Sequence, residues 1–358
     1  MRRQPYVFAP HHNRRMRVGS WLIALLFFFA IVSTIFFVNL SINTRVALRT
    51  DSVRILGLPK DLEGFKVLHI SDLHASSLGS RMEIWKELLY GKNYHAVVMT
   101  GNMIGKSGEY EPFVSLVHSL SQINPNAPIF FIEGDEDPEA IVSQYHGSQD
   151  VLSEWVRAGE KAGGIYLDKP MSVKKGKHTA WFVPEFLYGV DAQGMARSLS
   201  AQLADMESKG LPYEASSATE YRALHYRLTN MEHTKAVIDG LTGDELQIAV
   251  MHAPADINYI RNSLSWAKEA ELFGYRNIDL LLAGYYCAGQ WRLPGGKALY
   301  MPEKGFFPPD EGLVGMQRIN SLNVHISGGL GASGSHPLPG RLFNAPSVTL
   351  LTFTGRLK

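Results

Sequence analysis

Cysteine and clustered charge are both scarce in this chain. Its 358 residues contain a single cysteine, Cys287, so no disulfide can form within the chain, and cysteine usage does not indicate a redox compartment. The formal net charge is +1, and the basic residues are scattered except at the very start, which argues against a nucleic-acid-binding surface. No internal repeat or low-complexity tract is visible either.

Apolar sequence, in contrast, is plentiful and includes one long run near the N-terminus. With 45% hydrophobic residues, the chain can bury a full core in one large domain or two small ones. The twenty residues Trp21–Leu40 are interrupted only by Ser33, Thr34 and Asn39. As a helix they would extend roughly 30 Å, the thickness of a bilayer core. A membrane anchor is therefore predicted. A cleaved signal peptide is the alternative, although its apolar core is usually about 7–15 residues and a small-x-small cleavage site follows it.

Arginines flank this apolar run unequally. Because positive charge favours the cytoplasmic side, residues 1–20 are predicted to be cytoplasmic, 21–40 to cross the cell membrane once, and 65–358 to form a large extracytoplasmic domain after a tether and leading strand at 41–64. The asymmetry is weakened by the arginines that follow the run. The arginines are Arg2, Arg3, Arg14, Arg15 and Arg17 before it, and Arg45, Arg49 and Arg54 after it.

Beyond the tether, apolar runs of strand length alternate with amphipathic stretches, which is typical of βαβ units. Strands are expected at 45–56, 66–71, 96–100, 129–132, 246–251 and 278–283, and helices at 81–90 and 112–121. Short strands at 323–327 and 347–353 look like the second half of a β-sandwich. Residues 192–240 are expected to form a helical pair, broken by a loop at 210–217, that serves as a mobile lid over or beside a strand-end pocket.

Polar residues follow the expected strands at their ends. The strand at 66–71 runs into Asp72 and His74, which point the same way on an extended segment and can hold one cation. An Asp-x-His triplet is also compatible with an ordinary polar turn. Later strands end in GNMIG at 101–105, GDEDP at 134–138, HAP at 252–254 and GYYCAGQ at 284–290. Open α/β sheets present their sites at such strand ends.

The order of these motifs resembles the calcineurin-like metallophosphoesterases, most closely their membrane-associated bacterial branch. The resemblance runs from about Arg45 to the end and includes GQWRLPG, ALYMPEKGFF, ISGGLGASG and RLFNAPSVTLLTF near the C-terminus. It implies an α/β fold of two packed mixed sheets flanked by helices. It also implies a site with two metal ions that polarise a phosphate ester and activate the attacking water.

Three ligand positions of the family are intact: Asp72 and His74 in the D-x-H motif, and the later histidine, His252. Where the family has the bridging aspartate of G-D-x-x-D, this chain has Asn102. A carboxylate gives one anionic oxygen to each of two cations, whereas a neutral amide offers a single useful oxygen. Asn102 is therefore expected to be a poor bridge.

The family motif G-N-H-D/E appears here as Gly134, Asp135, Glu136 and Asp137. Asp135 stands at the ligand position of the asparagine and can bind a metal. Glu136 stands where the family has its transition-state histidine. We expect Glu136 not to replace that histidine, because an ionised carboxylate repels an incoming phosphate.

The family motif G-H-x-H-G-G-Q has lost both of its histidines. Tyr285 replaces the first, and a phenol with a pKa of about 10 is a reluctant ligand at neutral pH. Cys287 replaces the second. Its thiolate can ligate zinc or iron, while the alternative is a small core residue.

The exchanged Asp and Asn at positions 102 and 135 keep the predicted pocket acidic, and an acidic cluster is costly unless a cation or protons neutralise it. We expect one divalent ion (Mn, Fe or Zn) at most, or none. One hypothesis places a single ion between Asp72, His74, Asp135 and His252. In the alternative, Glu136 and Asp137 point to solvent. The full set of candidate ligand positions is Asp72, His74, Asn102, Asp135, His252 and Cys287.

Two functions are compatible with these substitutions. The preferred one is a pseudo-phosphoesterase that binds a phosphorylated small molecule, a lipid or an unidentified partner protein at the membrane. The other is an active hydrolase with a rewired, mononuclear site that acts on a phosphate ester near the membrane. The remaining histidines considered lack partners at suggestive spacing and are interpreted as ordinary strand, helix or surface residues: His69, His95, His118, His233 and His325.

Overall fold

The computed structural model describes residues 14–142, 150–214, 217–243, 245–254, 277–310, 312–319, 322–334 and 340–355. Arg2 and Arg3 of the predicted basic N-terminus lie outside this set, as does part of the expected loop at 210–217. The α-helices in the described residues are α1 (Arg14–Asn43), α2 (Met82–Leu89), α3 (Glu111–Ile123), α4 (Glu154–Lys161), α5 (Ala192–Ser208) and α6 (Ala218–Gly240). Three short 3-10 helices are η1 (Lys60–Leu62), η2 (Glu185–Gly189) and η3 (Leu211–Tyr213).

The described strands form two six-stranded sheets and one small sheet. The first sheet has the order β1 (Ala47–Arg54), β15 (Ser347–Thr354), β2 (Lys66–Ile70), β3 (Ala96–Thr100), β4 (Ile129–Ile132), β5 (Gly164–Tyr166). The second has the order β13 (Gly315–Ile319), β14 (Leu322–Ile326), β9 (Leu280–Ala283), β8 (Leu246–Val250), β7 (His178–Pro184), β6 (Met171–Lys175). The small sheet joins β10 (Trp291–Arg292), β11 (Ala298–Met301) and β12 (Gly305–Phe306).

Both large sheets are mixed, and their inner strands are parallel. Strands β2, β3, β4 and β5 run parallel, while β15 pairs antiparallel with β2 and parallel with β1. In the second sheet, β7, β8, β9 and β14 run parallel between the antiparallel edge strands β6 and β13. The two last long strands thus separate, with β14 in one sheet and β15 in the other. The predicted fold of two packed mixed sheets flanked by helices is confirmed.

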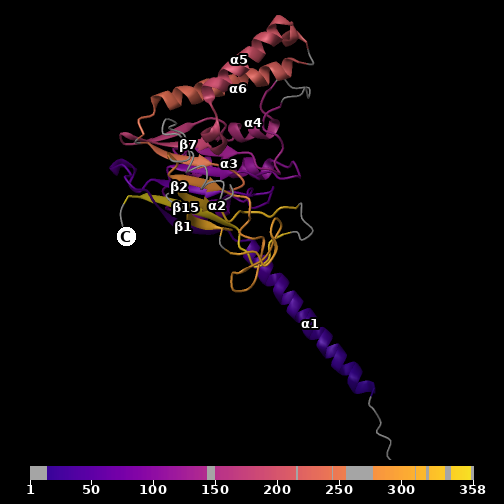
Figure 1. Cartoon of the computed structure of the whole chain (residues 1–358). Coiled ribbons are helices and arrows are strands. Elements are labelled where there is room, and N and C mark those ends of the chain that lie inside the picture. Colours follow the sequence, from indigo (N-terminus) through magenta and orange to yellow (C-terminus); the bar gives the residue numbers. More distant parts are fainter. Residues whose placement is uncertain are drawn as a thin grey trace, which may run out of the picture.

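The molecule is layered, with helices on the outer face of each sheet (Figure 1). Side chains alternate along each strand, so Val67 of β2 packs with Phe182 of the second sheet, while Leu68 packs with Phe113 of α3. On the other outer face, Leu281 of β9 packs with Leu199 of α5. Strands buried on both faces read as continuous apolar runs, which is why the inner strands could be predicted from the sequence.

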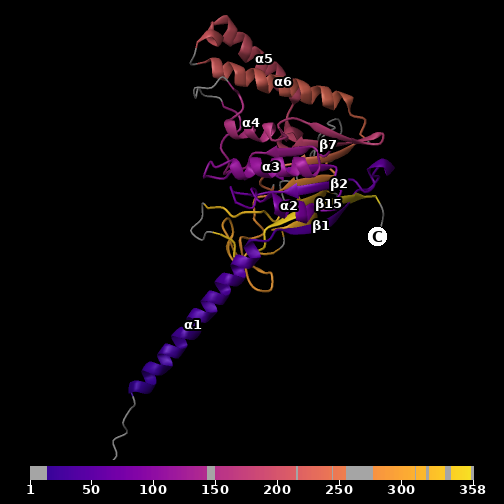
Figure 2. The same ribbon diagram turned by 180° about the vertical axis from the view of Figure 1, so that it is seen from behind.

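The helical pair and the apolar helix lie at opposite ends of the domain in both views (Figures 1 and 2). Residues Ser20–Asn43 of α1 form a helix of 24 residues that is long and apolar enough to cross a membrane. Its C-terminal end is attached to the domain, because Asn39 and Asn43 donate through Nδ2 to the carbonyl oxygen of Arg341 at 2.9 and 2.8 Å. The backbone N–H of Phe343 donates to Asn39 Oδ1 at 2.9 Å.

The parallel arrangement positions the site. Strands β2, β3 and β4 end at one edge of their sheet, and the loops that follow them are tied together by backbone hydrogen bonds. The N–H of Asp72 donates to the carbonyl of Gly101 at 3.0 Å, and the N–H of His74 donates to that of Asn102 at 2.9 Å. The polar residues predicted at three strand ends therefore meet.

Candidate metal and phosphate site

Asp72 lies at the centre of the site and is fully buried. Its carboxylate accepts a hydrogen bond from Ser71 Oγ at 2.5 Å and from the N–H of Tyr285 at 3.1 Å. The backbone φ is 51° at Asp72 and 46° at His74, in the left-handed region. Such residues cost of order 1–3 kcal/mol each and gather at functional sites, where the surrounding structure enforces them. The turn after β2 is thus built to aim these two side chains.

Three potential ligands come together here: Asp72, His74 and Cys287, whose ligand atoms lie within 4.8 Å of one another. His74 Nε2 is 4.0 Å from Asp72 Oδ1 and 4.0 Å from Cys287 Sγ. Burial raises the pKa of the Cys287 thiol. Carboxylate, imidazole and thiolate are the ligands of zinc and related ions. The trio therefore fits one divalent ion, once the thiol and the imidazole have released their protons.

Glu136 faces inward and contacts His74 rather than solvent. Its Oε2 lies 3.3 Å from His74 Nδ1, and its Oε1 accepts a hydrogen bond from Ser333 Oγ at 2.6 Å. Burial by itself lowers the pKa of His74, but the contacts with Cys287 and Glu136 outweigh it and raise that pKa. Within the protein alone, His74 is therefore an imidazolium paired with a carboxylate.

Asn102 connects two loops through both ends of its amide. Its Nδ2 donates to Asp135 Oδ1 at 3.0 Å, and its Oδ1 accepts the N–H of Glu136 at 2.9 Å. A side chain at Gly134 would collide with this amide, so the two loops pack closely. The one oxygen that Asn102 could offer to a cation is already used in holding the Glu136 backbone.

Asp137 is turned into the neighbouring loop and does not face the pocket. Its carboxylate accepts four backbone N–H groups, at 2.7–3.2 Å. A carboxylate with this many donors is well stabilised without a metal ion. Asp137 is therefore a brace between the loops after β3 and β4. The donors belong to Met103, Ile104, Gly105 and Gly134.

His252 and Asp135 form a second polar pair. His252 Nδ1 donates to the carbonyl of Thr100 at 2.7 Å, and Nε2 lies 2.9 Å from Asp135 Oδ1. Burial lowers the pKa of His252, but the hydrogen bond to Asp135 outweighs it and raises that pKa. The same bond lowers the pKa of Asp135 to about 2. The Tyr285 ring stands edge-on to the His252 ring at 5.4 Å.

The candidate ligands are therefore arranged as a trio and a pair. Asp72 and His74 lie with Cys287, while Asp135 and His252 engage one another. The predicted set of four ligands around one ion stays a prediction.

Arg341, which no motif in the sequence singled out, supports the site from behind. This buried guanidinium donates to the carbonyls of Gly331, Gly328 and Asn344 at 2.7, 2.9 and 2.8 Å. The N–H of Gly331 in turn donates to the carbonyl of Asp72 at 2.6 Å. Only the glycine-rich run at 328–334 hinted at such a close approach of backbone to the site.

Comparison with known proteins identifies the class. The family model of the calcineurin-like phosphoesterases matches residues 65–284, which is more than half of the chain. The chain belongs to the calcineurin-like phosphoesterase family. No curated protein matches it.

Two solved structures share parts of the arrangement. Phosphopantetheinyl hydrolase (PptH) from Mycobacterium tuberculosis is 12% identical, with a TM-score of 0.32, and the match covers 75% of this chain and 91% of that one. The protein TT1561 of Thermus thermophilus is 12% identical, with a TM-score of 0.37, and the match covers 75% of this chain and 90% of that one.

Proposed function

We propose that this chain is a membrane-anchored member of the family that binds a phosphate-bearing ligand or a partner protein and has lost, or strongly reduced, two-metal hydrolysis. At most one divalent ion (Mn, Fe or Zn) binds, at Asp72, His74 and Cys287. The remaining polar groups of the site hold each other and orient the ligand.

The observation that carries this proposal is the environment of Asn102. A two-metal site needs a ligand with an anionic oxygen for each ion, and the amide of Asn102 has one neutral oxygen. That oxygen accepts the N–H of Glu136, and the amide nitrogen donates to Asp135. The residues present therefore fit one ion but do not fit a pair.

The charges of the site also oppose efficient hydrolysis. Glu136 pairs with His74 at 3.3 Å, so the position at which the family has a histidine presents a carboxylate. A bound ion supplies positive charge that attracts a phosphate oxygen. His252, held between Thr100 and Asp135, is a further cationic donor. Loss of one cation and one positive donor removes several kcal/mol of transition-state stabilisation, at about 1.4 kcal/mol per tenfold in rate.

Two observations support attachment to a membrane. The span Ser20–Asn43 has a mean hydropathy of 2.7 in its most apolar window. In addition, the small sheet carries exposed Leu293, Phe306 and Phe307, and its strand β10 pairs with Leu342, next to the residues that hold the end of α1. Apolar and aromatic side chains at the outer end of a span suit the membrane–water interface. The arginine distribution supports a cytoplasmic N-terminus. A signal sequence is the alternative for the same helix.

An active hydrolase with a mononuclear site is the second candidate. The observation that favours it is the closeness of Asp72, His74 and Cys287, because a thiolate in place of a histidine selects a softer ion without destroying the site.

A steady-state assay separates the two candidates. The full chain in detergent is given a chromogenic phosphodiester with Mn²⁺, Zn²⁺, Fe²⁺ or Mg²⁺, beside an Asp72→Ala control. We expect turnover orders of magnitude below about 1 per second, a modest rate for an enzyme. Metal-dependent turnover at or above that rate, absent in the control, would establish the hydrolase and overturn the proposed loss of activity.

A further inference from the structure

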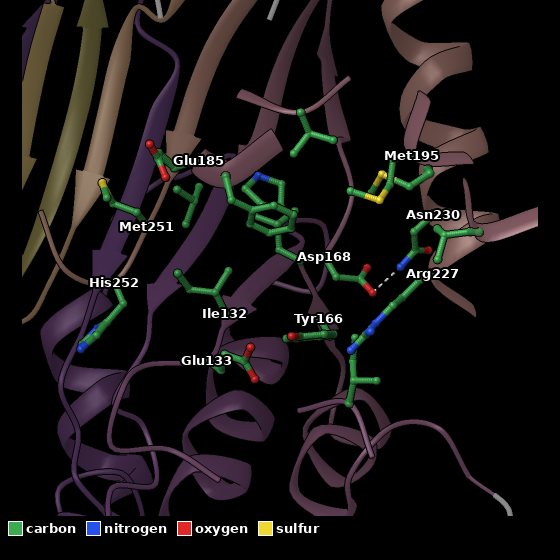
Figure 3. A pocket seen from close by; sticks show the side chains of 18 of the residues that line it. Ile132, Glu133, Tyr166, Asp168, Glu185, Met195, Arg227, Asn230, Met251 and His252 are labelled. Atoms are coloured by element: carbon green, nitrogen blue, oxygen red, sulfur yellow. Dashed lines mark hydrogen bonds between the residues drawn. The ribbon is translucent and has the colours of Figure 1, made fainter. Parts of the chain in front are cut away.

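A cavity of about 660 Å³ lies between the second sheet and the helical pair (Figure 3). His252 forms part of its wall, so the cavity is continuous with the candidate site. In the figure, His252 stands at one side, and Met195, Asn230 and Arg227 stand at the other. Pockets of 300–1,000 Å³ are the usual size for small-molecule ligands.

Apolar side chains make up most of the wall. Leu199 of α5 and Leu224 of α6 contribute from the helical pair, and Val250 of β8 contributes from the sheet. Two further lining residues are large, apolar and half exposed: Met195, at 45%, and Phe186, at 56%. Exposed apolar surface in a concave site gains roughly 25 cal/mol per Å² when a ligand covers it.

Polar groups gather at the side away from His252 and are already paired. Asn230 Nδ2 donates to Asp168 Oδ2 at 2.5 Å, and Lys169 Nζ donates to Asn230 Oδ1 at 3.3 Å. These bonds fix the wall built by α6 and leave the apolar surface between them and His252 as the face that a ligand would cover.

We propose that this cavity holds the apolar portion of the same ligand whose phosphate group binds beside His252, so that the ligand is an alkyl or acyl phosphate ester. The inference rests on the proposed function, because it takes the phosphate position from it. The helical pair α5 and α6 then forms a wall of the binding site. Continuity with His252 selects this occupant, since a chain attached to a phosphate at the site can enter the cavity directly.

Binding of alkyl phosphates of increasing length tests this assignment. The full chain in lipid nanodiscs is titrated with ethyl, butyl, hexyl and octyl phosphate, with empty nanodiscs as the blank. Each added methylene that becomes buried is worth about 0.8 kcal/mol, so we expect about fourfold tighter binding per methylene until the cavity is filled.

Two variants place a charge in the cavity without touching the core. Met195→Glu and Phe186→Glu replace half-exposed side chains, so the fold should persist. We expect ethyl phosphate to bind them as it binds the original chain, and the dependence on length to disappear. Tyr213→Glu is the matched control, because Tyr213 is 93% exposed and does not line the cavity; it should keep that dependence.

The possible failures are distinguishable. Equal affinity for all four esters in the original chain would overturn the cavity assignment and leave the proposed function standing. The cavity assignment also fails if the two cavity variants keep the dependence on length that the Tyr213 control shows. Failure of every ester to bind, ethyl phosphate included, would overturn phosphate binding at the site itself.

Discussion

Two buried histidines predict that the fold loses stability in mild acid. His69 of β2 and His325 of β14 meet between the two large sheets, with their Nδ1 atoms 2.7 Å apart. Burial lowers the pKa of both, and for His325, to which the charge of Arg49 also contributes, it falls to about 3. Asp51 lies 3.7 Å from His325 Nε2, too weak a partner to reverse this, and Thr100 Oγ1 is 3.0 Å from His69 Nε2.

The direction follows from comparing folded and unfolded chains. An unfolded histidine titrates near 6.5, so below that pH the unfolded state binds protons that the folded state refuses, and stability falls as the pH falls. For His325 alone the loss is about 1.4 kcal/mol per pH unit, which amounts to about 2 kcal/mol at pH 5 and about 5 kcal/mol near pH 3. His69 acts in the same direction.

Urea unfolding of the domain, followed by tryptophan fluorescence of the full chain in nanodiscs at pH 8 and pH 5, measures this loss. We expect His325→Gln to lose at least about 2 kcal/mol less than the original chain between these pH values. The control is His118→Gln on the exposed face of α3, which should keep the original pH dependence. An unchanged pH dependence in His325→Gln would refute the reasoning.

Three further predictions concern the site, the core and the membrane. Tyr285→His with Cys287→His should not restore phosphodiesterase activity, whereas adding Asn102→Asp and Glu136→His should raise it at least about tenfold; robust hydrolysis by the double variant would show that the last two positions matter less. Burial raises the pKa of Asp279 to about 6, so its ionised form costs stability above that pH; Asp279→Asn, which keeps an acceptor for the Gln247 N–H, should stabilise the fold at pH 7.5 by up to about 3 kcal/mol in urea titrations, and no gain would count against it. Protease added to intact spheroplasts should digest the domain, and full protection would contradict the proposed orientation.

The sequence was most informative where burial alone decides the structure. Strands β3 (Ala96–Thr100) and β4 (Ile129–Ile132) have the bounds predicted from their apolar runs, and the helical pair at 192–240 was found as expected. Helix α4 and the strands β5, β6 and β7 were missed. The hairpin of β6 and β7 lies at the sheet edge, where β6 alternates half-buried and exposed residues and carries lysines, so its sequence is not a continuous apolar run.

The site was predictable as a set of strand ends, but its internal partners were not. Asp137 could not be distinguished from a solvent-facing residue, because its donors are backbone N–H groups whose positions depend on the fold. Arg341 and Asp72 are remote in sequence, and His69 and His325 are 256 residues apart. Contacts of this kind arise only once the two sheets have packed face to face.

The metal content of the purified full chain tests the central claim most directly. After exposure to Mn²⁺, Fe²⁺ or Zn²⁺ and exhaustive dialysis, the ions per chain are counted by mass spectrometry of the elements, beside Asp72→Ala. We predict one ion per chain or none, with any bound ion lost in the variant, because Asn102 cannot bridge a pair. Two ions per chain would contradict this prediction.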